Sequence, residues 1–228
     1  MKNNVLHKAI LKGASFKEAV SKQLLSTDAL QQKNDDGLTP LALSIQVGNK
    51  YFFNLLLSRG KDAIDYEGLT ALHIACAVGE VGMYKGLKEY YSDININDNG
   101  GWTPLHWAVQ EGHTSIVKDL LSSGADPNLG DAHGITPLCL SVTEGRQKIF
   151  EYLLGVGGNV KQKIEDETLL HIATAWDNRW FVKRLLECGL SPYEKDDSGL
   201  TPYDIAINEN HKAIKNMFSS IAKDVRSD

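Results

Sequence analysis

The sequence predicts an all-α fold in which about seven copies of one repeat, a turn followed by two short helices, stack side by side. The first observation is a tripeptide, Thr-Pro-Leu, that occurs at Thr39–Leu41, Thr103–Leu105 and Thr136–Leu138. The second is its spacing, because related tripeptides continue the series and successive threonines lie 31, 33, 33, 32 and 33 residues apart. These threonines are Thr39, Thr70, Thr103, Thr136, Thr168 and Thr201. Such a period predicts repeats that each pack only against their neighbours.

The composition is that of an ordinary soluble protein, because 42% of the 228 residues are hydrophobic and 23% are charged. A formal net charge of −5 argues against nucleic acid as a partner, since dedicated nucleic-acid binders carry a basic excess. No apolar run approaches the roughly 18 residues of a membrane span, and residues 1–8 lack the apolar stretch of a signal peptide. Three scattered cysteines suggest a reducing compartment rather than a disulfide framework. We therefore expect a cytoplasmic protein with no membrane partner.

The turn and first helix of a repeat are clearest over residues 98–112. Residues 98–101 read Asp-Asn-Gly-Gly, which is turn chemistry because glycine tolerates positive φ. Thr103 is a good N-cap, and Pro104 suits the first helical position, where a missing N–H costs nothing. Apolar and small residues follow at helical spacing, and Gly112 is well placed to end the helix.

The second helix of the same repeat begins near Ser115, which we expect to be its N-cap. It carries an apolar stripe made of Ile116, Val117, Leu120 and Leu121. Residues 124–128, Gly-Ala-Asp-Pro-Asn, then break the helix and lead into the next turn.

Two helices this short bury their apolar faces only when neighbouring repeats stack on them. Equivalent positions of successive repeats form rows, and one row is leucine: Leu41, Leu72, Leu105, Leu138 and Leu170. Another row holds only serine and alanine: Ser44, Ala75, Ala108, Ser141, Ala173 and Ala206. We expect a single domain over residues 1–228 whose repeats are 1–33 as N-terminal cap, 34–64, 65–97, 98–130, 131–162, 163–195 and 196–228 as C-terminal cap.

These features resemble the ankyrin-repeat family, whose repeat of about 33 residues carries the signature Thr-Pro-Leu-His-x-Ala. The nearest match is Gly101–Ala108, and Gly68–Ala75 and Thr168–Ala173 match in part. The resemblance covers essentially the whole chain. It implies an ankyrin-type helical solenoid with short turn or β-finger connections, and a general recognition scaffold rather than one particular function.

One repeat departs from this pattern. Lys163–Thr168 lacks the expected glycine at position 166, and Asp177-Asn178 stands where Gly-His is usual. We therefore expect an altered turn in this repeat.

The histidines follow the repeat register. The resemblance implies that the histidine at the fourth signature position bonds near the helix start and staples neighbouring turns; these are His7, His73, His106 and His171. His113 and His211 fall in the Gly-His slot between helices, which leaves His133 as the alternative candidate for a catalytic or metal-binding role.

Catalytic signatures are missing from the sequence. It contains no P-loop, no Gly-x-Ser-x-Gly and no His-Glu-x-x-His. Cys76, Cys139 and Cys188 form no Cys-x-x-Cys pair, so we interpret them as small buried hydrophobic residues. We expect no enzyme activity, no cofactor and no bound metal.

Recognition of a protein partner is the function that remains, on the concave face that turn tips and first helices form in the family. Trp107 shares a row with apolar residues, so we expect it to pack between repeats. For Trp102 the sequence does not decide between packing and binding. Trp176 shares a row with glutamates, so we expect it to be exposed. The candidate partner-binding residues are Tyr66, Glu67, Asn99, Trp102, Gln110, Glu111, His133, Ile135, Glu144 and Trp176. We expect a monomer that acts as an adaptor, an inhibitor or an effector. The alternative is a bacterial effector delivered into a host cell, or a regulatory subunit that depends on an associated enzyme.

Overall fold

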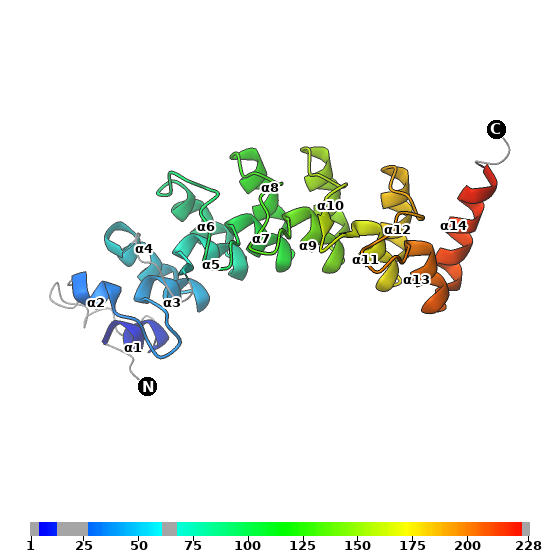
Figure 1. Ribbon diagram of the computed structural model, residues 1–228. Coiled ribbons are helices and arrows are strands. Elements are labelled where there is room, and N and C mark those ends of the chain that lie inside the picture. The colour runs from blue at the N-terminus through cyan, green and yellow to red at the C-terminus, as the bar shows by residue number, and fades with distance from the viewer. Residues whose placement is uncertain (1–4, 13–26, 61–67, 225–228) are drawn as a thin grey trace. The chain divides into compact units, whose positions relative to one another are not determined.

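The computed structural model describes residues 5–12, 27–60 and 68–224, and in these ranges it contains fourteen helices and one two-stranded sheet. The chain divides into two compact parts, an N-terminal half (Met1–Asp126) and a C-terminal half (Pro127–Asp228). Figure 1 labels their helices in chain order. The elements are α1 (Val5–Lys12), α2 (Thr27–Gln31), α3 (Pro40–Gln46), α4 (Lys50–Gly60), α5 (Ala71–Val78), α6 (Val81–Lys88), α7 (Pro104–Gln110), α8 (Thr114–Ser122), α9 (Pro137–Thr143), α10 (Gln147–Gly155), β1 (Lys163–Ile164), β2 (Glu167–Thr168), α11 (Leu169–Ala175), α12 (Arg179–Glu187), α13 (Pro202–Asn208) and α14 (Lys212–Asp224).

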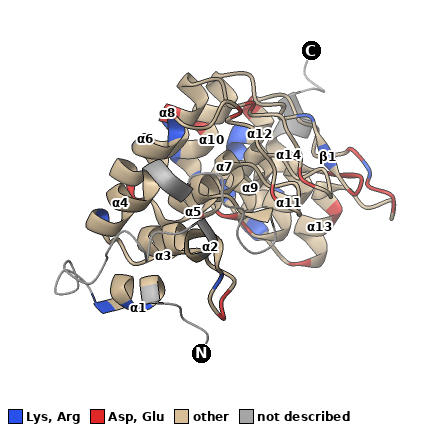
Figure 2. Cartoon of the chain, turned by 90° about the vertical axis from the view of Figure 1, so that its left-hand side faces the viewer, with Lys and Arg blue, Asp and Glu red and all other residues tan. Residues whose placement is uncertain are grey.

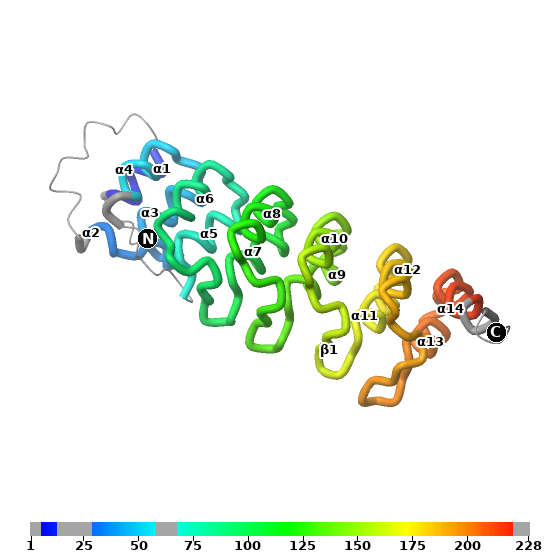
Figure 3. The backbone as a smooth tube through the Cα atoms, turned by 90° about the horizontal axis from the view of Figure 1, so that it is seen from above, coloured from blue at the N-terminus to red at the C-terminus, as the bar shows by residue number. Residues whose placement is uncertain are grey.

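Within each half, helices alternate between two layers. In the N-terminal half α5 packs between α3 and α7, while α6 contacts both α4 and α8 in the second layer. In the C-terminal half α11 packs between α9 and α13, and α12 contacts α14 (Figure 3). We call α3, α5, α7, α9, α11 and α13 the first helices, and their partners α4, α6, α8, α10, α12 and α14 the second helices. The predicted all-α repeat architecture is confirmed, whereas the number of repeats and the single-domain boundaries stay predictions.

The first helices begin where the threonine and proline signature places them. The side-chain oxygens of Thr39, Thr103 and Thr136 accept hydrogen bonds from backbone N–H groups three residues later. Proline occupies the first turn of these helices, where its fixed φ is already helical. Local sequence therefore determines the start of each first helix.

The core of each half is built from the predicted rows. The leucine row is almost fully buried, with Leu72, Leu138 and Leu170 at 0% exposure, and the small-residue row is buried as well. Alanine and serine in that row let neighbouring helices approach closely. The rows thus hold adjacent repeats together within each half.

Two local predictions have different outcomes. The expected irregularity after residue 162 is confirmed: β1 and β2 pair antiparallel, and the two residues between them, Glu165 and Asp166, have φ angles of 48° and 64°. Two positive φ angles are typical of a type I′ hairpin turn, here made without glycine. The prediction that Ser115 caps α8 is wrong, because α8 already begins at Thr114 with His113 as N-cap.

Candidate recognition surface

The signature histidines are structural residues. His73, His106 and His171 are fully buried, and the Nδ1 atom of each accepts the backbone N–H of the threonine three residues earlier at 3.1, 3.1 and 3.2 Å. Because Nδ1 is an acceptor, the ring proton lies on Nε2.

That Nε2 proton reaches across to the next turn. The ring of His73 bonds the carbonyls of Ile96 and Trp102 at 3.0 and 3.1 Å, and the ring of His171 bonds the carbonyl of Leu200 at 3.2 Å. Burial lowers the pKa of His73, which favours the neutral ring that this geometry needs. The predicted stapling role is confirmed for these two residues, and His7 bonds the carbonyl of Leu38 at 2.8 Å in the same way.

The cysteines are not poised for nucleophilic chemistry. Cys76 and Cys139 are buried, and burial raises the pKa of each thiol. Cys188 is half-buried, and desolvation raises its pKa too. Since the thiolate is the reactive form, all three are small apolar residues in this fold.

Across the ranges that the structure describes, no group of three or more His, Cys, Asp and Glu side chains is arranged to hold a metal ion. His133 is exposed on a turn, where its backbone N–H bonds Asp131. None of the helices in the described ranges is both long enough and apolar enough to cross a bilayer.

The turn tips are held by aspartate side chains. The Oδ1 atom of Asp98 accepts the N–H groups of Gly100 and Trp102, both at 2.9 Å. Asp131 does the same for His133 and Ile135, at 2.8 and 2.9 Å. These bonds fix the tips as rigid platforms for the residues on them.

The N-terminal half presents two tryptophans beside one such tip. Trp107 is half-buried and its indole Nε1 donates to Asp98 at 3.0 Å. Trp102 is also half-buried, and its ring lies 5.0 Å from the Trp107 ring and 5.9 Å from that of His106. Both tryptophans therefore carry part of the packing, so the structure gives Trp102 a structural role besides its candidate binding role.

The remaining candidates of this half differ in exposure. Asn99 lies exposed on the turn tip, Glu111 is exposed as the C-cap of α7, and Gln110 is half-buried just before it. Tyr66 and Glu67 lie outside the described residues.

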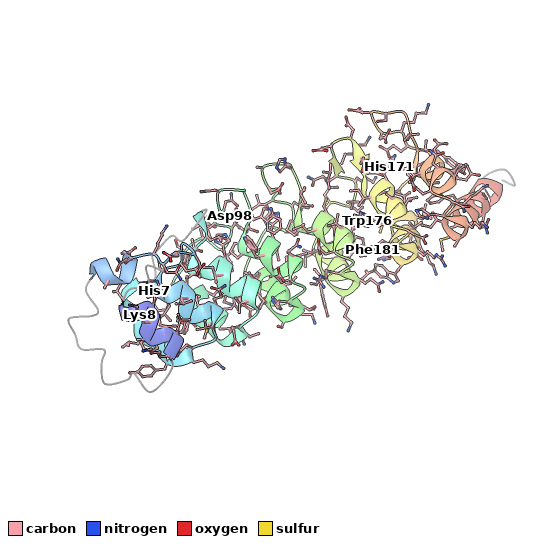
Figure 4. All side chains as sticks on the ribbon, turned by 90° about the horizontal axis from the view of Figure 1, so that it is seen from below. His7, Lys8, Asp98, His171, Trp176 and Phe181 are labelled. Atoms are coloured by element: carbon pink, nitrogen blue, oxygen red, sulfur yellow. The ribbon has the colours of Figure 1, made fainter. Side chains whose placement is uncertain are left out.

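The C-terminal half brings Glu144 and Trp176 into one row. They are the C-cap residues of the neighbouring helices α9 and α11, and Glu209 is the C-cap of α13 on the other side of α11. The Trp176 side chain, which is labelled in Figure 4, is 73% exposed. The exposure expected for Trp176 is confirmed.

The other candidates of this half lie at the turn tip before α9. His133 is exposed and Ile135 is half-buried there. The sequence did not identify Ile207, in the last turn of α13, as an exposed apolar residue, although its side chain is 44% exposed. The equivalent residues of other repeats are buried: Cys76, Val109, Val142 and Thr174. Because α13 has only α11 beside it among the described first helices, this position is partly open.

Carboxylates also meet at neighbouring turn tips of the C-terminal half. A hydrogen bond with Asp166 on the β1–β2 turn raises the pKa of Asp197 on the next turn. Lys163 of β1 forms an ion pair with Glu194 at 2.7 Å, which links the same two turns. These tips are therefore acidic and joined to one another by side-chain contacts.

Comparison with known families gives one match. The family model described as ankyrin repeats in three copies matches residues 48–131, 92–164, 116–196 and 138–227. These segments together span residues 48–227, most of the chain. No curated protein matches the sequence.

Proposed function

Because the chain belongs to the ankyrin-repeat family, we propose that it is a non-catalytic module that binds a protein partner through its turn tips and first helices. The family serves widely as a protein–protein interaction scaffold, which supports the general role. The binding face is carried over from the family onto the matching residues of this chain, and adaptor, inhibitor and effector are the roles that the proposal allows.

The observation that carries the proposal is the contrast between the histidines and Trp176. Polar side chains that look catalytic are buried and fully engaged in stapling turns, as His73 is. A large aromatic residue, Trp176, stands exposed where its neighbours in the row are polar. Tryptophan is enriched among the residues that contribute most binding energy at protein interfaces.

The proposed partner is an intracellular protein. All three cysteines are free, which is typical of proteins in a reducing compartment. These cysteines support the proposal of a cytoplasmic protein that acts as a monomer and binds another protein.

Affinity purification with quantitative mass spectrometry tests this function. The wild-type protein is compared with Trp176→Ala and with Tyr152→Ala, a matched control because Tyr152 is 39% exposed on the second helix α10. We expect specific proteins on the wild type and the control that are depleted on Trp176→Ala. Identical sets of proteins on all three would contradict the proposed face, and enrichment of no protein would contradict the proposed function.

A further inference from the structure

The exposed indole of Trp176 stands between two carboxylates at the ends of three parallel helices. Trp176, Glu144 and Glu209 are the C-caps of α11, α9 and α13, and α11 packs between the other two helices. All three have nearly the same backbone conformation, with φ between −86° and −87° and ψ between 0° and 8°. The three side chains thus leave equivalent positions along one edge, which we call the C-cap edge.

Helix stability does not explain the two glutamates on this edge. The carboxyl end of a helix carries partial negative charge, so a cation is favourable there and an anion is unfavourable. Glu144 and Glu209 add two negative charges to three such helix ends. Their placement opposes local stability and concentrates negative potential around the Trp176 ring.

Charge is segregated across the whole C-terminal half. The second helices α10, α12 and α14 contain seven Lys and Arg against three Asp and Glu. The other described residues from 127 onward, which form the turns, connections and first helices, contain eleven Asp and Glu against four Lys and Arg. Figure 2 shows acidic residues on the loops beside β1 and on α13, and basic residues on α12. Seven of the eleven acidic residues lie in the turns that precede the first helices, at the far end from the C-cap edge. At the edge itself the carboxylates are Glu144, Asp177 and Glu209, and Asp177 pairs with Arg179 at 3.6 Å. Glu144 and Glu209 are thus the carboxylates that share a row with Trp176.

We propose that the C-cap edge binds a basic segment of the protein partner, with a Lys or Arg side chain on the face of Trp176 and flanked by Glu144 and Glu209. This proposal rests on the proposed function and names the partner's chemistry. An indole face attracts a cation, and the flanking carboxylates pair with it. Nucleic acid and anionic lipid are repelled by this surface, since both carry negative charge.

Selection from a displayed library of random 12-residue peptides tests the proposal, because the library has no bias in charge. Selected peptides are synthesised, and their affinities are measured by fluorescence anisotropy at low and physiological salt. We expect peptides rich in Lys and Arg whose affinity weakens about tenfold or more for Trp176→Ala and for the double variant Glu144→Gln with Glu209→Gln. The controls Tyr152→Ala and Glu151→Gln on α10 should bind as the wild type does.

Each other result overturns the proposal in a distinguishable way. Neutral or acidic peptides that lose affinity on Trp176→Ala would refute the basic partner while leaving the proposed function standing. Basic peptides that are unaffected by the C-cap variants would show that the edge is not their site. Failure to select any peptide, or self-association of the protein through its basic second helices in sedimentation, would remove both this proposal and its premise of a monomer that binds another protein.

Discussion

Gly79 and His113 make a contact whose energy the structure allows us to predict. Gly79 is the C-cap of α5 with φ 81° and ψ 13°, and the ring of His113 lies directly against it. The His113 Nε2 atom bonds the carbonyl of Ala77 at 2.9 Å, which links the second helix of one repeat to the first helix of the repeat before. A Cβ atom at position 79 would stand 2.3 Å from Cε1 of His113, far inside contact distance.

Gly79→Ala should therefore cost about 3 kcal/mol. Left-handed backbone in alanine contributes about 1 kcal/mol, the lost His113 bond about 1 kcal/mol, and displacement of the ring about 1 kcal/mol. His113→Ala should cost about 1 kcal/mol, because it removes the bond alone. The double variant should cost about 2 kcal/mol, since no ring remains to be displaced, which leaves a coupling of about 2 kcal/mol.

Urea unfolding followed by circular dichroism measures all three variants, with free energies from linear extrapolation. Gly145→Ala is the matched control, because Gly145 holds the same repeat position with φ 68° and a Cβ there meets nothing within 4 Å. It should cost only the backbone strain, about 1 kcal/mol. Additive effects of Gly79→Ala and His113→Ala, or an equal cost at both glycines, would refute the reasoning.

Three further predictions follow from the same kind of argument. Asp177 has a φ of 48°, and the His211 ring lies 3.9 Å from its carboxylate with no hydrogen bond at Nε2. Glycine adopts positive φ without strain and would leave the His211 ring free to form a hydrogen bond, so Asp177→Gly should raise the free energy of unfolding by about 1 kcal/mol. An unchanged or lower free energy of unfolding in urea would contradict this. Burial lowers the pKa of His73, so the unfolded chain binds the proton more readily and stability should fall as pH drops below about 6.5; a urea midpoint that is higher at pH 5.5 than at 7.5 would count against it. Trp176→Ala should leave the thermal midpoint nearly unchanged, because the ring is 73% exposed. Trp102→Ala should lower the midpoint by several degrees, because that ring packs against Trp107 and His106. A larger drop for Trp176→Ala than for Trp102→Ala in differential scanning calorimetry would show that the packing roles are misassigned.

The sequence was sufficient where a feature depends on residues close together in the chain. Threonine and proline determine where the first helices start, as at Thr103, and the missing glycine near position 166 was enough to predict an irregular turn. Glutamates in its row were enough to predict the exposure of Trp176. Each of these is a local or register property that repeats along the chain.

Features that depend on how side chains pack against one another were beyond the sequence. The burial of Trp102 comes from its contacts with Trp107 and His106 above the Asp98 turn. At His211 the Nε2 atom has no hydrogen-bond partner, and the ring lies 3.9 Å from the carboxylate of Asp177 in the repeat before. Register alone does not indicate which side chain fills that space.

Photo-crosslinking from the C-cap edge tests the central claim most directly, which is that this face recognises a protein. A benzophenone amino acid is placed at position 176, and in a matched variant at position 152 on α10; the native side chains there are 73% and 39% exposed. With the partner from affinity purification, we expect crosslinks from position 176 that map to a Lys- or Arg-rich segment, and none from position 152. Crosslinks from position 152 alone would show that the second helices bind the partner and would contradict the account.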